Sequence, residues 1–270
     1  MPFRREFNTT FQRPSNPISH CIHTLGRASP TRRKRYRHRH GTDLQLTLVN
    51  ALPSSASDAV RDYVNGTAVA DDHMVAARGA AVEYGLTTPD AMTGEFLTFL
   101  AARAGSTPPS AVVMSPAFGV IGLHLFAGFG TVGGHVTCID PEAQHQTLAR
   151  HAFAGAGVRS NAYRFLPSAP LDGVTRLASD SYDLIISESE VEHLSATVDA
   201  ALPALRPGGV LVLLDSLLDG TLGDPEHTDR QVRAAREADD YLAEIASTGS
   251  ITVARLPLGA GTTIVTKRGQ

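Results

Sequence analysis

Three carboxylates each follow an apolar run that has the length of a buried strand. Asp140, Glu188 and Asp215 come after runs at 135–139, 182–186 and 210–214. Polar residues at the carboxyl ends of parallel strands lie where open α/β sheets bind their ligands. A carboxylate there can bind ribose hydroxyls, hold a cation or take a proton from a substrate. Each acid could instead be a solvated loop residue, so the repetition at three strand ends is what indicates a site.

Asp140 also has the spacing of a ribose-binding acid. It lies 21 residues after Gly119, across a stretch that reads as turn, helix and strand. A nucleotide-binding βαβ unit places this acid about 20 residues beyond its glycine turn. The glycine pattern is weak, however, because Ser115 and Ala117 stand where a tight turn favours glycine. This stretch alone leaves two readings open, a nucleotide site and a purely structural turn.

The elements that must position these residues alternate along the chain. Apolar runs predict strands at 111–114, 135–139, 163–166, 182–186, 210–214, 251–256 and 262–266. Helices are predicted at 58–64, 72–84, 89–103, 120–126, 141–153, 171–178, 193–205 and 228–247. The third has Thr88 as its predicted N-cap and Pro89 as its first helical residue. Gly259-Ala260-Gly261 indicates a hairpin between the last two strands. The fold class is therefore α/β: a Rossmann-like, seven-stranded, mostly parallel sheet with a C-terminal antiparallel hairpin, preceded by N-terminal helices.

Charge divides the 270 residues unevenly. Residues 1–41 hold ten Lys and Arg and one acid, whereas the remainder holds 14 basic and 26 acidic residues. We therefore expect a basic, disordered tail at 1–43 and a folded domain at 44–270. The tail could bind nucleic acid, act as a transit peptide or be a simple extension. No apolar run is long enough to span a membrane, and Cys21 and Cys138 suggest no disulfide framework, which favours a cytoplasmic protein.

Several segments resemble the class I S-adenosylmethionine-dependent O-methyltransferases, in particular the catechol and caffeoyl-CoA O-methyltransferase branch and its actinobacterial members. These segments are YDLII at 182–186, LRPGGVLVLLD at 205–215 and LPLGAG at 256–261. With the order of elements and the final hairpin, the resemblance extends over about residues 48–268. It implies methyl transfer from S-adenosylmethionine to a hydroxyl of a small-molecule substrate, by a protein that forms a homodimer.

The family's cofactor positions are partly kept. In its first motif, acid-x-Gly-x-x-x-Gly, the acid falls on Val113, the first glycine falls on Ser115, and only Gly119 is retained. Asp140 matches the ribose-binding acid, and Ser168 matches a position beside the adenine. The resemblance thus implies a cofactor site formed by Val113, Ser115, Pro116, Ala117, Gly119, Ile121, Asp140, Ser168 and Glu188.

The family's metal and catalytic positions have also changed. Glu188 takes the first metal position, and Asp215 and Ser216 take those of an Asp-Asn pair. Their oxygens imply a divalent cation such as Mg²⁺. The family's catalytic lysine falls on Val191, so the expected proton acceptors are Glu188 and His193, although a lone loop histidine can simply be solvated.

Two functions follow from this mixture. The first is an active O-methyltransferase. The second is a catalytically inactive methyltransferase-fold protein that acts as a binding or regulatory module, which the changes at Val113, Ser115, Ala117 and Val191 favour. A nucleic-acid methyltransferase is disfavoured, because the folded part is acidic and lacks the (Asn/Asp)-Pro-Pro-Tyr motif of base methyltransferases.

Overall fold

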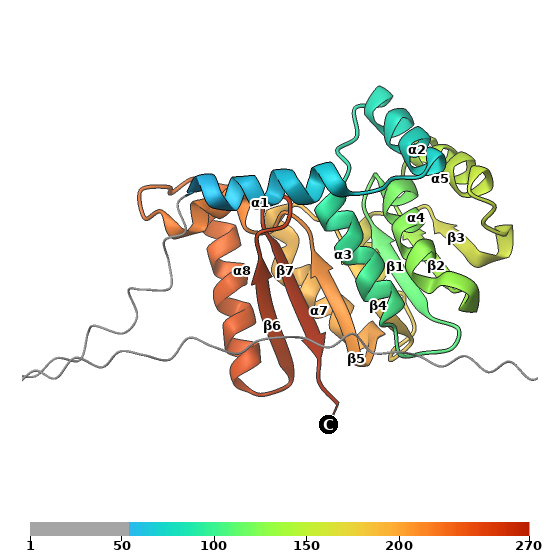
Figure 1. Ribbon diagram of the computed structural model, residues 1–270. Coiled ribbons are helices and arrows are strands. Elements are labelled where there is room, and N and C mark those ends of the chain that lie inside the picture. The colour runs from blue at the N-terminus through green and yellow to red at the C-terminus, as the bar shows by residue number, and fades with distance from the viewer. Residues whose placement is uncertain (1–53, 270) are drawn as a thin grey trace, which may run out of the picture. The chain divides into compact units, whose positions relative to one another are not determined.

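A computed structural model describes residues 54–269, with side chains described from residue 58 onward. The tail predicted at 1–43 lies outside the described residues. The described part forms one seven-stranded sheet (Figure 1). In spatial order its strands are β3 (Tyr163–Leu166), β2 (His135–Ile139), β1 (Ser110–Met114), β4 (Tyr182–Ser187), β5 (Leu205–Leu213), β7 (Thr262–Lys267) and β6 (Ile251–Leu256).

The strand directions confirm the predicted sheet. Strands β3, β2, β1, β4 and β5 are mutually parallel, and β7 runs antiparallel between β5 and β6. The register places Val113 of β1 beside Cys138 of β2 and Ile186 of β4. These central strands are buried on both faces, which explains why they read as continuous apolar runs.

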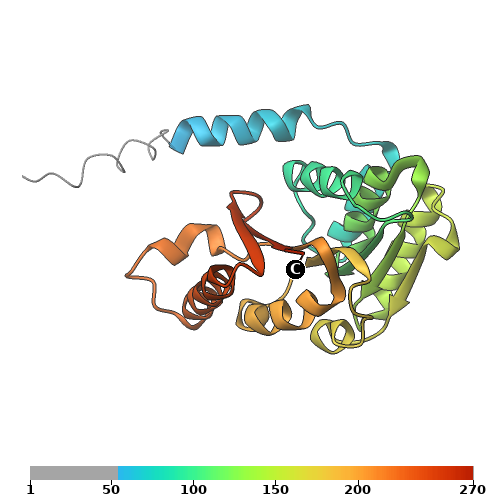
Figure 2. The same ribbon diagram turned by 90° about the horizontal axis from the view of Figure 1, so that it is seen from below.

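Helices cover both faces of the sheet. They are α1 (Ser54–Thr67), α2 (Asp72–Glu83), α3 (Ala91–Ala102), α4 (Phe118–Phe129), α5 (Ala143–Gly155), α6 (Pro170–Val174), α7 (Leu194–Ala204) and α8 (Arg230–Ser247). Helices α2 to α5 share one apolar core with the sheet, and α6 to α8 share another. Figure 2 shows the two layers, with green α3 on one side of the strands and orange α7 and α8 on the other. None of these helices between residues 54 and 269 combines the length and apolarity needed to cross a membrane.

Helix α3 begins later than the Thr88-Pro89 signal predicted. Asp90 is the N-cap, because its Oδ1 accepts a hydrogen bond from the backbone N–H of Thr93 at 2.8 Å. A carboxylate three residues before an unpaired N–H satisfies that donor, and this interaction determines where the helix starts. The predicted start was therefore wrong by two residues, and Thr88 and Pro89 lie in the loop before the helix.

Two glycines of α4 serve helix packing. A Cβ on Gly119 would lie 3.0 Å from the Cα of Ala149 on α5, and one on Gly122 would lie 2.6 Å from the ring of Phe153. Both positions therefore let α4 and α5 approach closely. Gly119, the glycine retained from the family's first motif, is therefore needed for the packing of α4 against α5.

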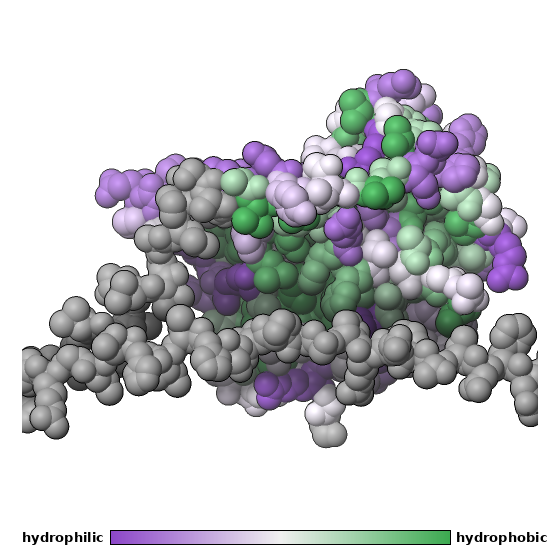
Figure 3. Space-filling view, in the orientation of Figure 1, coloured by the Kyte–Doolittle hydropathy of each residue, from purple (hydrophilic) through white to green (hydrophobic). Residues whose placement is uncertain are grey.

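Apolar surface lies on the face that carries α1 and α3 (Figure 3). The side chains of Val60, Tyr63 and Phe99 on these helices are more than half exposed. Helix α1 also reaches the hairpin, where Nη2 of Arg61 donates a hydrogen bond to the carbonyl of Pro257 at 3.3 Å.

Candidate functional site

The predicted strand-end residues meet at one edge of the sheet. Strands β2, β1, β4 and β5 are adjacent and parallel, so the residues that follow them lie at a common carboxyl edge. Asp140 follows β2, Ser115 follows β1, Glu188 follows β4, and Asp215 lies two residues beyond β5. This is the edge at which open α/β sheets bind ligands.

Asp140 is buried, with 6% of its surface exposed, and one of its oxygens is already bound. Oδ1 accepts hydrogen bonds from the backbone N–H of Glu142 at 2.7 Å and from Nδ1 of His145 at 2.9 Å. These donors come from the start of α5 and fix the plane of the carboxylate. Oδ2 has no hydrogen-bond partner among the described residues, so it can accept one from a ligand.

Glu188 reaches across from β4 to the turn after β1. The hydroxyl of Ser115 donates a hydrogen bond to its Oε2 at 2.5 Å, and its own backbone N–H donates to the carbonyl of Met114 at 2.8 Å. Burial raises the pKa of the Glu188 carboxyl, the Ser115 hydrogen bond opposes that rise, and the negative charge of Asp215 adds to it. Glu188 is therefore a carboxylate whose charge is poorly compensated.

The turn between β6 and β7 holds Asp215. The backbone N–H of Ala260 donates to its Oδ1 at 2.7 Å. Gly259 has a φ of +58°, and a Cβ there would lie 2.5 Å from the same oxygen. Asp215 itself has a φ of +53°, which costs free energy for any residue other than glycine. Gly259 and Ala260 therefore hold the Asp215 carboxylate in place from the hairpin.

A cavity of about 270 Å³ opens beside Glu188 and Asp215. Its lining comes from the loop before α3, the start of α3, the ends of β4 and β5, and the hairpin turn: Thr87, Thr88, Pro89, Asp90, Thr93, Glu188, Leu214, Asp215, Gly259 and Ala260. The hydroxyl of Thr93 is buried and has no hydrogen-bond partner among the described residues. An unpartnered buried hydroxyl is costly, so it indicates a place where a polar ligand would bind.

Thr93 and Asp90 were not predicted from the sequence as site residues. Asp90 is engaged at both oxygens, by the Thr93 N–H and by Nδ2 of Asn65 at 3.4 Å. The only signal in the sequence was an acid three residues before Thr93, which fits an N-cap. That Asp90 and Thr93 line the cavity depends on the packing of α3 against the sheet.

The three metal candidates do not form a set of free ligands. The hydroxyl of Ser216 bonds to the carbonyl of Leu213 at 3.1 Å, to Oγ1 of Thr263 at 2.9 Å and to the N–H of Thr263 at 3.1 Å. Ser216 is thus committed to joining β5 and β7. Across residues 58–269, no cluster of three or more His, Cys, Asp or Glu side chains is arranged to hold a metal ion.

His193 is not part of the cavity lining. It ends a short 3₁₀ helix, Val191–His193, and its side chain is 57% exposed. Its Nδ1 lies 3.7 Å from Oε2 of Glu190 on the same surface turn. The ring therefore faces solvent beside another surface carboxylate.

The remaining cofactor candidates lie around the turn after β1 and the end of β3. Val113 and Ile121 are fully buried in the apolar core. Pro116, Ala117 and Gly119 line a small cavity of about 20 Å³ that also contacts His145. Ser168 follows β3, and its N–H donates to the carbonyl of Leu166 at 2.9 Å.

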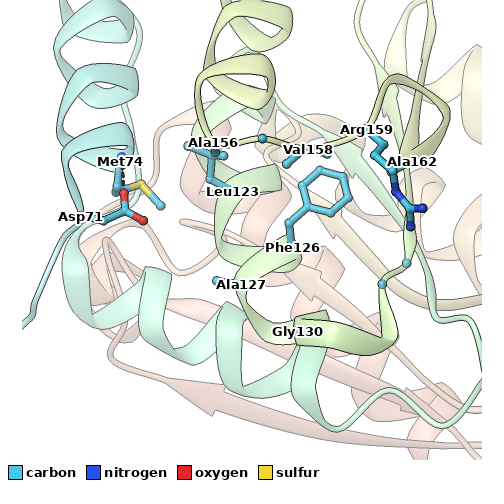
Figure 4. A pocket seen from close by; sticks show the side chains of 13 residues that line it. Asp71, Met74, Leu123, Phe126, Ala127, Gly130, Ala156, Val158, Arg159 and Ala162 are labelled. Atoms are coloured by element: carbon cyan, nitrogen blue, oxygen red, sulfur yellow. Dashed lines mark hydrogen bonds between the residues drawn. The ribbon is translucent and has the colours of Figure 1, made fainter.

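A further hollow, of about 360 Å³, lies away from these residues (Figure 4). Gly133 and Gly134, which line it, directly precede β2, so it lies at the amino edge of the sheet. Figure 4 shows Phe126, Val158 and Arg159 on one side of it and Asp71 and Met74 on the other. It is separate from the strand-end carboxylates.

Comparison with known proteins gives these residues a context. No family model matches the chain. A protein of Mycobacterium marinum assigned to the O-methyltransferases is 32% identical over 222 residues, which is 82% of this chain and 96% of that protein. A counterpart in Mycobacterium avium with the same assignment is 34% identical over 221 residues, with the same coverage.

Solved structures are similar over the same region. A protein of Corynebacterium glutamicum shares 45% identity and a TM-score of 0.75, covering 80% of this chain and 98% of its own. The O-methyltransferase TomG of Streptomyces achromogenes, solved in complex with S-adenosylmethionine, has a TM-score of 0.64 at 20% identity, over 79% of this chain and 96% of its own. The likeness to TomG shows that the two proteins share a fold.

Proposed function

Because this chain belongs to the O-methyltransferase family, we propose that it transfers the methyl group of S-adenosylmethionine to a hydroxyl oxygen of a small molecule. The observation that carries the proposal is the convergence of Asp140, Glu188 and Asp215 at one edge of the sheet, beside a cavity of about 270 Å³. Nothing in the comparisons favours the inactive alternative.

The residues present fit the methyl donor at its ribose. Asp140 has one oxygen committed to α5 and a second oxygen available to a ligand hydroxyl. Bound there, S-adenosylmethionine supplies an electrophilic methyl group. The half-buried Ser168, beyond β3, remains the proposed contact on the adenine side. The apolar side chains of Val113 and Ile121 would support the turn between β1 and α4 from the core rather than form hydrogen bonds with the donor.

The cavity is proposed to hold the acceptor. Asp215, fixed through Oδ1 by Ala260, can orient the acceptor hydroxyl and take its proton through the other oxygen. The hydroxyl of Thr93 can bond to a second polar group of the acceptor. The remaining requirement is alignment of the nucleophile with the methyl group, which rigid strand ends and a shaped cavity can supply.

The donor set does not fit the divalent cation that the resemblance implied. The Ser216 hydroxyl has no bonding capacity left, and both oxygens of Asp90 are engaged. Among the residues that line the cavity, this leaves the carboxylates of Glu188 and Asp215. Mg²⁺ requires near-octahedral coordination by several oxygens. These residues therefore assign no step of the proposed reaction to a metal ion.

Assembly and location are further parts of the proposal. We infer a homodimer that covers the exposed apolar side chains of Val60, Tyr63 and Phe99. Light scattering should give twice the mass of one chain, and Tyr63→Asp with Phe99→Asp should halve it. We also propose a cytoplasmic location. Residues 44–270 are proposed to form the methyltransferase domain, and a chain that starts at residue 44 should therefore retain cofactor binding.

Calorimetric titration of S-adenosylhomocysteine into the full chain tests the proposed function. We expect micromolar affinity in the wild type and a loss of about 100-fold in Asp140→Ala, since charge-assisted hydrogen bonds to the ribose are removed. Glu142→Ala is the matched control, because its exposed side chain lies two residues away and only its backbone contacts Asp140. A folded wild-type protein that does not bind at millimolar ligand would contradict the proposal and support the inactive alternative.

A further inference from the structure

A hollow of about 310 Å³ adjoins the proposed acceptor cavity at the hairpin turn. Gly259 and Ala260 line both spaces, so the two share this short stretch of wall. The rest of the lining of the hollow comes from α1, the segment after β5 and the end of β6, and it includes two cations, Arg61 and Arg255. A molecule bound in the cavity can therefore extend past the turn and meet these cations.

Arg61 reaches this hollow from α1 with its charge unpaired. Its Nη2 donates a hydrogen bond to the carbonyl of Pro257 at 3.3 Å, which holds the guanidinium at the end of β6. Within residues 58–269, Arg61 forms no ion pair with an Asp or Glu side chain. A guanidinium carries five N–H donors, so most of those of Arg61 stay available to a ligand. Figure 1 shows α1 beside the turn between β6 and β7, where this side chain lies.

The charge of Arg61 also acts inside the acceptor cavity, which Asp90 lines. Burial raises the pKa of Asp90, but hydrogen bonds from Thr93 and Asn65 and the positive charge of Arg61 together lower it. Arg61 therefore lies close enough to attract a negative group of a molecule that occupies the cavity.

The other charges of the hollow leave Arg61 as its main free cation among the described residues. Nε of Arg255 lies 2.6 Å from Oδ1 of Asp239, so the charge of Arg255 is already shared. Asp219 is the acid of the lining, and it is exposed to solvent, which screens its charge. An anionic group that enters the hollow is therefore attracted chiefly to Arg61.

The segment after β5 lines the hollow in a costly conformation. Leu218 and Asp219 have φ values of +47° and +55°, in the left-handed region that favours glycine. Two hydrogen bonds to the hairpin hold this segment, from the N–H of Leu217 to the carbonyl of Gly261 at 3.1 Å and from the N–H of Asp219 to the carbonyl of Ala260 at 2.7 Å. Backbone strain of this kind is concentrated at binding sites, where the surrounding structure maintains it. The strain therefore supports a binding role for the hollow.

We propose that Arg61 binds an anionic group of the acceptor, a carboxylate or a phosphate, while the reacting hydroxyl lies at Asp215. The proposal rests on the proposed function and names the class of acceptor: small hydroxylated acids with the anion and the hydroxyl at opposite ends. A planar guanidinium can bind either anion through two parallel hydrogen bonds. Arg61 is then a specificity residue, because it orients the acceptor from outside the reacting centre.

Two probes that differ in charge provide the test. 3-(3,4-Dihydroxyphenyl)propanoate carries its hydroxyls and its carboxylate at opposite ends, whereas the corresponding amide has nearly the same shape and no charge. Each is titrated calorimetrically into the full chain saturated with S-adenosylhomocysteine. We expect the acid to bind the wild type about tenfold more tightly than the amide. Arg61→Gln should weaken the acid by about 5- to 20-fold and leave the amide within about twofold.

Variants at other arginines separate this role from a structural one. If Arg61→Gln only loosened α1, it would weaken both probes alike. Arg103→Gln is the matched control, because Arg103 is exposed beyond the far end of α3, and its loss should leave both probes unchanged. Arg255→Gln should weaken the acid by less than about threefold, because Asp239 already shares its charge. Equal losses for the two probes in Arg61→Gln, or a larger loss of the acid in Arg255→Gln than in Arg61→Gln, would overturn the inference.

Inorganic phosphate distinguishes the two anions. If phosphate binds the same saturated wild type and Arg61→Gln weakens it, the result supports the inference and assigns the acceptor a phosphate. A preference for the acid without phosphate binding supports the inference and assigns a carboxylate. A wild type that shows neither property but binds S-adenosylhomocysteine would overturn the inference and leave the proposed function standing. A wild type that does not bind S-adenosylhomocysteine would overturn both.

Discussion

Nδ1 of His145 lies 2.9 Å from Oδ1 of Asp140, and the same oxygen accepts the backbone N–H of Glu142. Both donors belong to the first turn of α5 or the residue before it. The Asp140 carboxylate is therefore oriented by the helix that follows it. Because Oδ1 is held by these two donors, the direction of Oδ2 is set before any ligand binds. Residues that orient a binding group in this way commonly matter nearly as much as the group itself.

His145→Ala should weaken S-adenosylhomocysteine and 5′-methylthioadenosine equally, by about 3- to 10-fold, because it loosens Asp140 without removing it. Titration calorimetry on the folded variant measures both affinities. His151→Ala is the control, since His151 is exposed on the same helix. Unchanged affinities in His145→Ala would mean that the N–H of Glu142 alone orients the carboxylate.

The sheet and Asp140 could be predicted from the sequence because their signals are local. Apolar runs between turn residues indicate strands, and the spacing from Gly119 to Asp140 follows from the length of one helix and one strand. The Ser115–Glu188 hydrogen bond could not be predicted, since it joins residues 73 apart and depends on β4 lying next to β1. Ser168 remains a prediction, because nothing observed tests its contact with adenine.

Some residues were assigned to chemistry although packing explains them. Gly119 looked like a cofactor-approach glycine, yet its missing Cβ makes room for the backbone of Ala149. Ser216 looked like a metal ligand, yet its hydroxyl is saturated within the sheet. A residue type at a motif position does not say which neighbour uses it, and only tertiary contacts decide that.

Gly119→Ala should therefore destabilise the fold, by about 1–3 kcal/mol, since a methyl group at 3.0 Å from the Cα of Ala149 meets backbone that cannot move aside easily. Urea unfolding followed by circular dichroism measures the change. Gly79→Ala on α2 is the control: no atom lies within 4 Å of the added methyl, and alanine favours helix. It should stabilise by about 0.5–1 kcal/mol. A neutral Gly119→Ala would show that α4 and α5 can separate at little cost.

A second stability prediction concerns the amino edge of the sheet. The side chain of Asp183 is 7% exposed, and it accepts hydrogen bonds from the N–H of Ser106 at 3.0 Å, the N–H of Ser110 at 2.8 Å and Nη1 of Arg206 at 2.9 Å. It also accepts one from the hydroxyl of Ser106. One carboxylate thus joins β4 to the loop before β1 and to β5.

Asp183→Asn should lower the free energy of unfolding by about 3 kcal/mol, because it leaves buried donors and the Arg206 charge without an acceptor. Denaturant titration gives the value. Asp180→Asn is the matched control, since Asp180 pairs with Lys267 at 2.7 Å with 61% of its side chain exposed. A surface pair of this kind contributes less than about 1 kcal/mol. Similar losses in the two variants would contradict the role assigned to Asp183.

The half-buried imidazole of His124 predicts how stability depends on pH. The hydroxyl of Thr98 donates to the carbonyl of Gly94 at 3.0 Å, so Nδ1 of His124, 3.2 Å away, must carry a proton and donate to Thr98. Nε2 then accepts from Nη2 of Arg78 at 3.3 Å. Burial, followed by the positive charge of Arg78, lowers the pKa of His124 from 6.5 to about 4, against a smaller opposing effect of Asp71.

The folded protein therefore keeps His124 neutral at a pH where the unfolded chain protonates it. Stability from this group is complete above the unfolded pKa of about 6.5 and is lost as the pH falls toward the folded value. Between pH 7 and pH 5 the loss should be about 2 kcal/mol. Between pH 7 and pH 5, we expect the unfolding free energy of the wild type to fall by about 2 kcal/mol more than that of His124→Gln. His151→Gln, a change at an exposed histidine, is the matched control and should follow the wild type. Parallel pH profiles for the wild type and His124→Gln would mean that the folded protein admits the His124 proton after all, through movement of Arg78 away from the ring.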